Sequence, residues 1–238
     1  FVISSKAGKQ AYVYPVKEDG DYRFTVRVGE PDQAASAGTA AGKRGGFLCL
    51  MSGTPIDYKY IRTEGSAGRM GARLMAIVAE GTRGRIYLTP TSEHEGIADA
   101  SLPEWRPEVQ LRGKCRVNVS NYGFDTYGDL FTSRQLVALT TFCDLVHDVI
   151  AHCRQDALVA GMEEDGLGLD AGGSGAQAYA EAIGLYLAFA ISKTSEYSSS
   201  LTVWYSREDR PKGLFARQAI PMVWDFAEQN PLGDVGGS

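Results

Sequence analysis

The chain carries few residues whose types and spacing could support catalysis. Ser174 lies in a Gly-Ser-Gly run, but residue 176 is alanine and no strand is expected before it, so the G-x-S-x-G nucleophile pattern is not met. The Gly-rich run at 166–175 lacks the Gly-Lys-Ser/Thr ending of a phosphate-binding loop and fits a linker better. We therefore predict no catalytic residue and no cofactor site within this chain.

The segment FLCLMSGTPI, residues 47–56, has the outline of a zinc knuckle, in which two thiolates three residues apart reach one ion. Ser52 stands where the second thiolate would be, and a single cysteine cannot supply the four ligands of a structural zinc site. Cys143 and His147 have a spacing that a metal could use on a helix, but they interleave with an apolar stripe. We therefore expect no bound metal.

A basic stretch is the strongest candidate site. Residues 43–85 carry 8 Lys and Arg against 3 Asp and Glu, whereas residues 128–238 carry 7 against 15. Arginine presents a fork suited to phosphate, and interleaved tyrosines can stack on exposed bases, so we expect a polyanion such as DNA to meet the first half. A sheet whose solvated face is merely basic remains the alternative. The arginines expected to bind DNA are Arg62, Arg69, Arg73, Arg83 and Arg85.

Two β-hairpins are expected to position this stretch. Residues 11–16 and 22–28 are rich in β-branched and aromatic residues, and the Asp19-Gly20 pair between them is a strong hairpin signal. Residues 73–80 and 85–90 flank a second turn at 81–84, and we predict that they form two further strands.

The second half reads as helical. Thr132 and Gln135 make a capping-box pattern, and apolar residues then repeat at steps of three and four to about Ala160. A second helix is expected at 176–195, central because residues 183–191 are apolar nearly all round, and a third at 215–229. Ser133, Arg134 and Gln135, at the start of the first helix, are candidates to bind phosphate or reach base edges.

The predicted fold class is therefore α+β, with N-terminal antiparallel hairpins followed by a C-terminal helical bundle. We expect a β-rich region at 1–102, a connector at 103–127 and a helical region at 128–238. The four cysteines are too scattered for a disulfide framework, which favours free thiols in a reducing cytoplasm. We found no apolar run of membrane-spanning length, so we expect a cytoplasmic protein without a membrane partner.

Five stretches, taken in order, resemble a known family: the large bacterial adenine-specific DNA methylases that contain a zinc ribbon and carry an N-terminal domain of unknown function. They are FVISSKAGKQAYVYPV, YIRTEGSAGRMGARLMAIVAEGTRGRIYLTPTSEHE, PEWRPE, NYGFDTYGDLFTSRQLVALTTFCDLV and FARQAIPMVWDFAEQNPLGD. They keep the family's order and are spread along the chain from residue 1 to residue 234.

The resemblance implies an internal segment of a larger enzyme. Members of the family carry a Gly-rich S-adenosylmethionine motif upstream of this region and an Asp-Pro-Pro-Tyr catalytic motif downstream, and neither occurs here. The family's ribbon uses one cysteine pair before residue 1 and a second at the Cys49 knuckle, of which only Cys49 remains, so the ribbon is degenerate. S-Adenosylmethionine would be bound by the parent enzyme and not by this chain.

Two functions follow as expectations. The first is a DNA-recognition or scaffold segment of an S-adenosylmethionine-dependent DNA adenine-N6 methyltransferase, with DNA and the remaining catalytic domain of the parent methylase as partners. The second is a protein-interaction module of a phage-defence or modification complex, whose acidic helical half would dock a partner. An independent hydrolase is disfavoured because no nucleophile has a base beside it.

Overall fold

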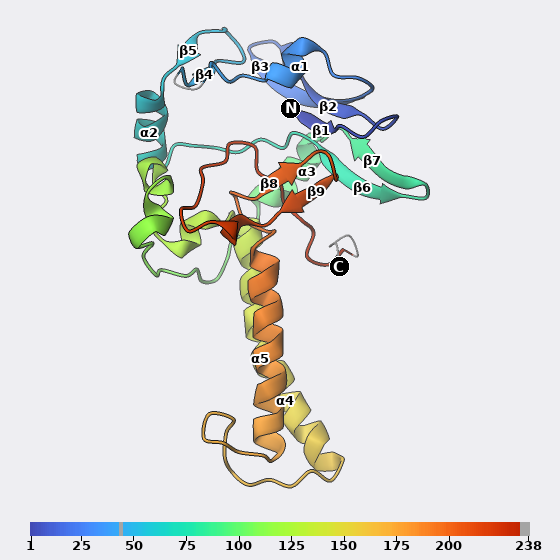
Figure 1. The fold of residues 1–238 in the computed structure, drawn as a ribbon, viewed down its shortest axis with the longest axis vertical. Coiled ribbons are helices and arrows are strands. Elements are labelled where there is room, and N and C mark those ends of the chain that lie inside the picture. The colour runs from blue at the N-terminus through green and yellow to red at the C-terminus, as the bar shows by residue number, and fades with distance from the viewer. Residues whose placement is uncertain (43–44, 234–238) are drawn as a thin grey trace.

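The computed structural model describes residues 1–42 and 45–233 of the 238-residue chain. Lys43 and Arg44, which belong to the expected basic stretch, and residues 234–238 lie outside the described residues. The fold is α+β, as predicted: small antiparallel sheets gather at one end, and two long helices project from them as a hairpin (Figure 1).

Strands β1 (Val2–Ser4), β2 (Ala11–Glu18) and β3 (Asp21–Val28) form an antiparallel sheet in the order β1-β2-β3. The predicted first hairpin is thereby confirmed. Asp19 and Gly20 both have positive φ, 45° and 86°, the turn conformation that matches the twist of paired strands. Glycine adopts this conformation without strain, and aspartate tolerates it better than most residues.

The second hairpin is also confirmed, although its first strand begins later than expected. Strand β6 (Ile77–Gly81) pairs with β7 (Gly84–Leu88), and the backbone N–H of Val26 donates a 3.0 Å hydrogen bond to Oγ1 of Thr89 just beyond β7. Side chains of both hairpins share one core. Its buried members are Ile3, Ala11 and Val13, packed against Phe1, Phe24, Val26, Met75, Ala76, Val78, Tyr87 and Trp204.

Four short elements lie between these hairpins in the chain: α1 (Gln33–Ala37), β4 (Phe47–Leu48), β5 (Pro55–Ile56) and α2 (Tyr58–Ser66). Helix α2 was not anticipated. The helix begins after Asp57, whose carboxylate accepts a 2.7 Å hydrogen bond from the N–H of Tyr60 and so caps the first turn. This cap outweighs the weak preference of the two tyrosines for strands. Helix α3 (Ser92–Asp99) follows β7 and has Thr91 as its N-cap residue.

Residues 103–130 contain three single turns of 3₁₀-helix, at Gly113–Arg116, Val119–Tyr122 and Tyr127–Leu130. They build a second core with residues from the C-terminal part of the chain. Its buried side chains are Leu111, Val119, Leu130, Leu201, Leu214 and Ile220. The expected connector is irregular, but it supplies half of a hydrophobic core at the base of the long helices.

Helix α4 (Ser133–Val159) begins as predicted. The Thr132 hydroxyl accepts from the N–H of Gln135 at 3.4 Å, and Oε1 of Gln135 accepts from the N–H of Thr132 at 2.9 Å. Helix α5 (Ala176–Ser195) also forms where expected and packs along α4, with Gly184 so close that an added Cβ would lie 2.5 Å from Cδ1 of Ile150. By length and apolar composition alone, α4 is the one helix among the described residues that could cross a membrane.

Two helical predictions are wrong. Helix α5 is not central, because Tyr186 is 75% exposed and Phe189 62% exposed on the side away from α4. The third helix is absent: only Leu214–Ala216 form a turn of 3₁₀-helix in the expected range 215–229. Pro221 has no N–H to donate and disfavours the helical conformation at Ile220, whose side chain is instead held in the second core.

The C-terminal part of the chain returns to the N-terminal sheets. Strand β8 (Val203–Tyr205) pairs with β9 (Arg210–Lys212), and Figure 1 shows this hairpin beside β1 and β6. A further bridge joins Val203 to Phe226. Residues after 200 therefore belong to both cores, and they are not an appendage of the helices.

Candidate nucleic-acid interface

The predicted arginines do not lie on one sheet surface. Arg62 is on helix α2, and its guanidinium lies 5.9 Å from the ring centre of Tyr122. Arg69 follows α2 and makes two hydrogen bonds, of 2.8 and 2.9 Å, with the carboxylate of Glu64. That bidentate hydrogen bond, together with the charge of Arg69, lowers the pKa of Glu64. A phosphate would have to displace this carboxylate.

Arg73 is also engaged within the chain. Its guanidinium donates to the carbonyl oxygen of Tyr22 and lies 4.9 Å from the Tyr22 ring centre. It also lies 3.5 Å from the Asp21 carboxylate and 3.7 Å from that of Glu95. Arg73 thus ties the extended segment before β6 to the first hairpin and to helix α3.

Arg83 and Arg85 are placed differently, on the β6–β7 hairpin. Arg83 lies exposed at the turn between the two strands, and none of the described residues forms an ion pair with it. Arg85 faces the β8–β9 turn, where its Nη1 lies 3.5 Å from the carbonyl oxygen of Glu208. These two arginines, and the exposed Arg62 on α2, are the members of the predicted arginine set without an ion pair among the described residues.

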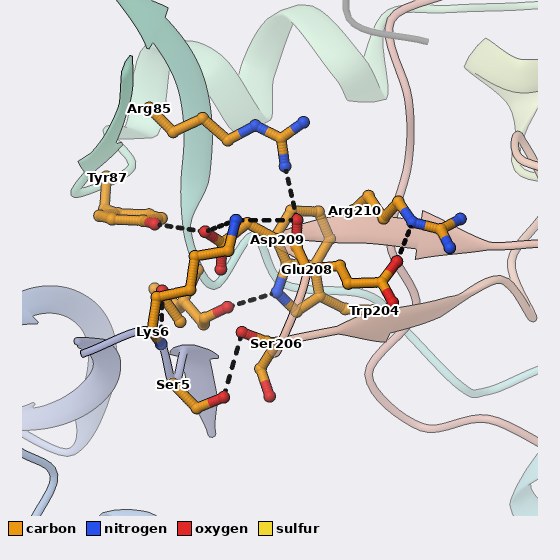
Figure 2. Close-up of polar contacts among 11 residues, drawn as sticks. Ser5, Lys6, Arg85, Tyr87, Trp204, Ser206, Glu208, Asp209 and Arg210 are labelled. Atoms are coloured by element: carbon orange, nitrogen blue, oxygen red, sulfur yellow. Dashed lines mark hydrogen bonds and ion pairs between the residues drawn. The ribbon is translucent and has the colours of Figure 1, made fainter. Parts of the chain in front are cut away.

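Two lysines that were not predicted to bind DNA, Lys6 and Lys9, also lie beside the β6–β7 hairpin. Nζ of Lys6 lies 3.2 Å from the same Glu208 carbonyl oxygen that Arg85 contacts, so one acceptor holds two cations together (Figure 2). Nζ of Lys9 lies 3.2 Å from the position that a Cβ on Gly84 would take, which puts it at the β6–β7 turn. Arg210 on β9 lies nearby and pairs with the Glu208 carboxylate.

We call Lys6, Lys9, Arg83, Arg85 and Arg210 the basic cluster. Its cations come from the β1–β2 loop, the β6–β7 hairpin and β9. Cations that lie close together in space are therefore up to about two hundred positions apart in the sequence. Three carboxylates, those of Glu80, Glu208 and Asp209, lie among them. The cluster is therefore net positive by two charges, in a chain whose overall net charge is −5.

A buried carboxylate fixes the geometry of the cluster. Asp209 is 2% exposed and has a positive φ of 53°. Its Oδ2 lies 3.0 Å from Nζ of Lys6 and accepts a 3.1 Å hydrogen bond from the Tyr87 hydroxyl. Burial, reinforced by the Asp209 carboxylate, raises the pKa of Tyr87, so this hydroxyl stays protonated and remains a donor.

Backbone contacts hold the same segments together. The indole N–H of Trp204 donates a 2.6 Å hydrogen bond to the carbonyl of Ile3, and the hydroxyl of Ser5 donates one of 3.3 Å to the carbonyl of Ser206 (Figure 2). The backbone N–H of Ser5 donates a further bond of 2.9 Å to the same carbonyl. Strand β1 and the β8–β9 hairpin therefore form one support for Lys6. Sequence reasoning missed this support, because no local pattern reveals pairing between residues two hundred positions apart.

The N-terminus of α4 holds a carboxylate of its own chain. Nε of Arg134 lies 2.6 Å from one oxygen of Glu228, and Nε2 of Gln135 donates a 2.8 Å hydrogen bond to the other. Ser133 is exposed beside them. Arg134 and Gln135 thus already bind an anion, as the sequence suggested for phosphate, but the anion is internal.

The knuckle turn between β4 and β5 keeps its shape without a second cysteine. The N–H of Gly53 donates a 2.8 Å hydrogen bond to the carbonyl of Cys49, and the N–H of Cys49 donates one of 2.8 Å to the carbonyl of Thr54. Hydrogen bonds from the side chain and backbone of Ser52 lower the pKa of the Cys49 thiol. No group of three or more His, Cys, Asp or Glu side chains within residues 1–42 and 45–233 is arranged to hold a metal.

The Gly-rich loop between α4 and α5 is wrapped around the carboxylate of Asp165. The N–H groups of Leu167, Ser174 and Gly175 donate to it at 3.0, 2.7 and 3.2 Å. These bonds, the one from Ser174 first, lower the pKa of Asp165. The loop thus uses its backbone donors as a phosphate-binding loop does, but on its own side chain.

An open groove of about 330 Å³ runs along α4. Its polar lining includes Glu104, Asp144 and Asp148, none of which is hydrogen-bonded to a serine or cysteine nucleophile in the described structure. The groove therefore presents carboxylates without the partners that acyl or phosphoryl transfer requires.

The fold and site define an α+β protein with a compact, net positive cluster of side chains on a rigid support. Comparison with known protein families, with characterised proteins and with solved structures gives no match.

Proposed function

We propose that this chain is a DNA-recognition or scaffold segment of an S-adenosylmethionine-dependent DNA adenine-N6 methyltransferase, without catalytic activity of its own. The observation that carries the DNA-binding part is the convergence of Lys6 and Arg85 on one carbonyl oxygen, 3.2 and 3.5 Å away. Two cations held this close, with Arg83 and Lys9 at the adjoining turn, suit the closely spaced charges of a phosphate backbone.

A role as part of a larger enzyme is the second part of this proposal. The resemblance in sequence to zinc-ribbon-containing adenine-specific DNA methylases supplies the proposed enzyme class, with S-adenosylmethionine bound by the parent.

We propose further that the β4–β5 turn is the remnant of that family's zinc ribbon. The hydrogen bonds of the Cys49 to Thr54 turn replace the metal as the element that closes it. In this proposal a serine took the place of the second thiolate, and the turn was retained because it leads into helix α2. The proposed location is the cytoplasm of a bacterial cell.

Fluorescence anisotropy with a labelled duplex tests the DNA-binding claim. At low salt, Arg83→Ala plus Arg85→Ala should weaken binding by about tenfold or more, because two phosphate contacts are lost. The charge-matched control is Arg154→Ala plus Lys193→Ala on the helical hairpin, which should bind like the unaltered chain. Failure of the unaltered chain to bind duplex or single-stranded DNA at low salt would overturn the proposal.

A second double variant, Arg69→Ala plus Arg73→Ala, tests the remaining predicted contacts. Both side chains are engaged with carboxylates of the chain, so we expect less than about threefold loss of affinity from this pair. A loss equal to that of the Arg83 and Arg85 variant would extend the interface to α2 and to the arginines there. Methyl transfer to adenine by the full-length parent, lowered by the Arg83 and Arg85 changes, would test the enzyme class.

The protein-interaction module is the second candidate function. The observation in its favour is the exposed apolar surface of α5, which no described part of the chain covers. Retained binding to a neighbouring protein of a modification complex, without binding to any nucleic acid, would favour it over DNA recognition.

A further inference from the structure

Helix α5 exposes a stripe of apolar side chains to solvent. We define the α5 stripe as Tyr179, Ala182, Tyr186, Phe189 and Ala190, which recur at steps of three and four and therefore share one side of the helix. Tyr179 is 47% exposed, Tyr186 75% and Phe189 62%. A helix in water normally turns such a stripe toward a core, and here the core side is occupied by α4 through Gly184.

The stripe is also free of charge. No charged residue occurs between Glu181 and Lys193, whereas the exposed positions of α4 include Asp144, Asp148 and Asp156. Packing the α4 face of one molecule against that of another would bring these carboxylates together at a cost in free energy. Packing two α5 stripes together would bury uncharged surface and keep the acidic faces of α4 on the outside.

The sequence of the stripe reads nearly the same in both directions from Tyr186. Ala182 and Ala190 lie four residues to either side, and Tyr179 and Lys193 lie seven residues to either side. In an antiparallel pair of α5 helices with a two-fold axis at Tyr186, each Tyr186 ring would pack against small residues of the other copy. Lys193 is held by Glu196 and by the ring of Tyr197 in its own chain, so it would lie at the edge of the pair and not within the contact.

We propose that the α5 stripe binds the α5 stripe of a second copy of this chain, antiparallel and two-fold symmetric about Tyr186, so that two helical hairpins form a four-helix bundle. This inference goes beyond DNA recognition and does not depend on it. A symmetric pair of this kind would hold two basic clusters at opposite ends of one assembly, because each hairpin projects from its own sheets (Figure 1).

The surface is large enough for a modest dimer. The exposed parts of the three aromatic rings amount to roughly 300–450 Å² per copy, given about 150–250 Å² for a whole aromatic side chain. Leu185, 49% exposed, and the alanines add to this. A standard specific interface buries about 800 Å² per partner, so we expect a reversible dimer rather than a permanent one.

Sedimentation equilibrium of the whole chain tests the proposal. The unaltered chain should show a monomer–dimer equilibrium, and Tyr186→Glu plus Phe189→Glu should raise the dissociation constant by about 30-fold or more. The control, Leu145→Glu on the acidic side of α4, should leave the equilibrium unchanged. Circular dichroism and thermal unfolding verify that each variant is folded.

A cross-linking experiment identifies the face directly. In a chain whose four cysteines are replaced by serine, Tyr186→Cys should form a disulfide-linked dimer under mild oxidation, because two such residues meet at the axis. Gln155→Cys, exposed on α4, should not. A monomer at all concentrations, a dimer that persists in the glutamate variant without cross-linking at 186, or association with lipid vesicles in place of dimerisation would each overturn the proposal.

Discussion

Nζ of Lys6 lies 3.0 Å from Oδ2 of Asp209, although 203 positions separate the two residues in the chain. Asp209 is buried, whereas the Lys6 side chain is 42% exposed and presents its amine to solvent. The pair therefore does two things. It closes the N-terminal sheet against the β8–β9 hairpin, and it holds one cation of the basic cluster in a fixed position.

Asp209→Asn should lower the free energy of unfolding by about 1–3 kcal/mol, because Lys6 loses the opposite charge beside its ammonium group and the bond from Tyr87 becomes a neutral one. Asparagine tolerates the positive φ of this position, so the change isolates the charge. Urea unfolding measures the effect. The neighbouring exposed change Glu208→Gln should cost less than about 0.5 kcal/mol, and equal losses from both would contradict a special role for the buried carboxylate.

Gly184→Ala should destabilise the helical hairpin even though alanine is the better helix former. The added Cβ would lie 2.5 Å from Cδ1 and 2.6 Å from Cγ1 of Ile150, so α4 and α5 must separate. Gly96→Ala on α3 is the matched control. A Cβ there meets nothing within 4 Å, and the change should stabilise by about 0.5–1 kcal/mol.

The effect of Gly184→Ala can also be measured in a chain that carries Ile150→Ala. Adding Ile150→Ala removes the atoms that the new Cβ would meet, so the Gly184 change should then stabilise, as at Gly96. If Gly184→Ala is stabilising in the unaltered background, the close approach of the helices does not limit their packing.

Local patterns predicted the elements that are decided locally. The Asp19-Gly20 turn and the Thr132–Gln135 cap were correct, because a two-residue turn and a helix start depend on side chains within a few positions. The helix expected at 215–229 failed because the burial of Ile220 and the bridge to Phe226 outweigh helical propensity there.

The candidate site was predicted only in part for the same reason. Arg83 and Arg85 were named from composition, and they lie in the basic cluster. Lys6 and Arg210 were missed, since only the packing of β1 against the β8–β9 hairpin brings them there. The ion pair that occupies Arg134 could not be anticipated either, because Glu228 is 94 positions away. The pair between Arg69 and Glu64, only five positions apart, was missed because helix α2 was not expected.

Asp165→Asn should loosen the loop between α4 and α5. The carboxylate collects three backbone N–H donors, and an amide oxygen is a weaker acceptor. Hydrogen–deuterium exchange of residues 166–175 should become faster in this variant and stay unchanged in Asp170→Asn. Equal protection in Asp165→Asn would show that the loop is held by other contacts.

The same carboxylate gives the loop an acid dependence. The folded-state pKa of Asp165 is lowered, so its contribution is present above the ordinary aspartate value of about 3.9 and is lost as the pH falls through the lowered pKa. NMR signals of the Ser174 and Gly175 amides should stay constant between pH 5 and 7 and shift below that range. A transition near neutral pH would contradict the assignment.

Ser52→Ala should slow alkylation of Cys49 by iodoacetamide near neutral pH. Hydrogen bonds from Ser52, the side chain first, lower the pKa of this thiol and raise the fraction of thiolate, the reactive form. Peptide mapping by mass spectrometry follows Cys49 separately from Cys143, whose pKa burial raises and which should react more slowly in both proteins. Unchanged alkylation of Cys49 would show that the turn does not activate it.

The salt dependence of duplex binding tests the central claim most directly. A plot of the logarithm of the binding constant against the logarithm of salt concentration has a slope set by the number of phosphates that the protein neutralises. Arg83→Ala plus Arg85→Ala should reduce the magnitude of that slope by about 2, while Arg154→Ala plus Lys193→Ala should leave it unchanged. An identical slope for the unaltered chain and the Arg83 and Arg85 variant would contradict the basic cluster as the DNA-binding surface.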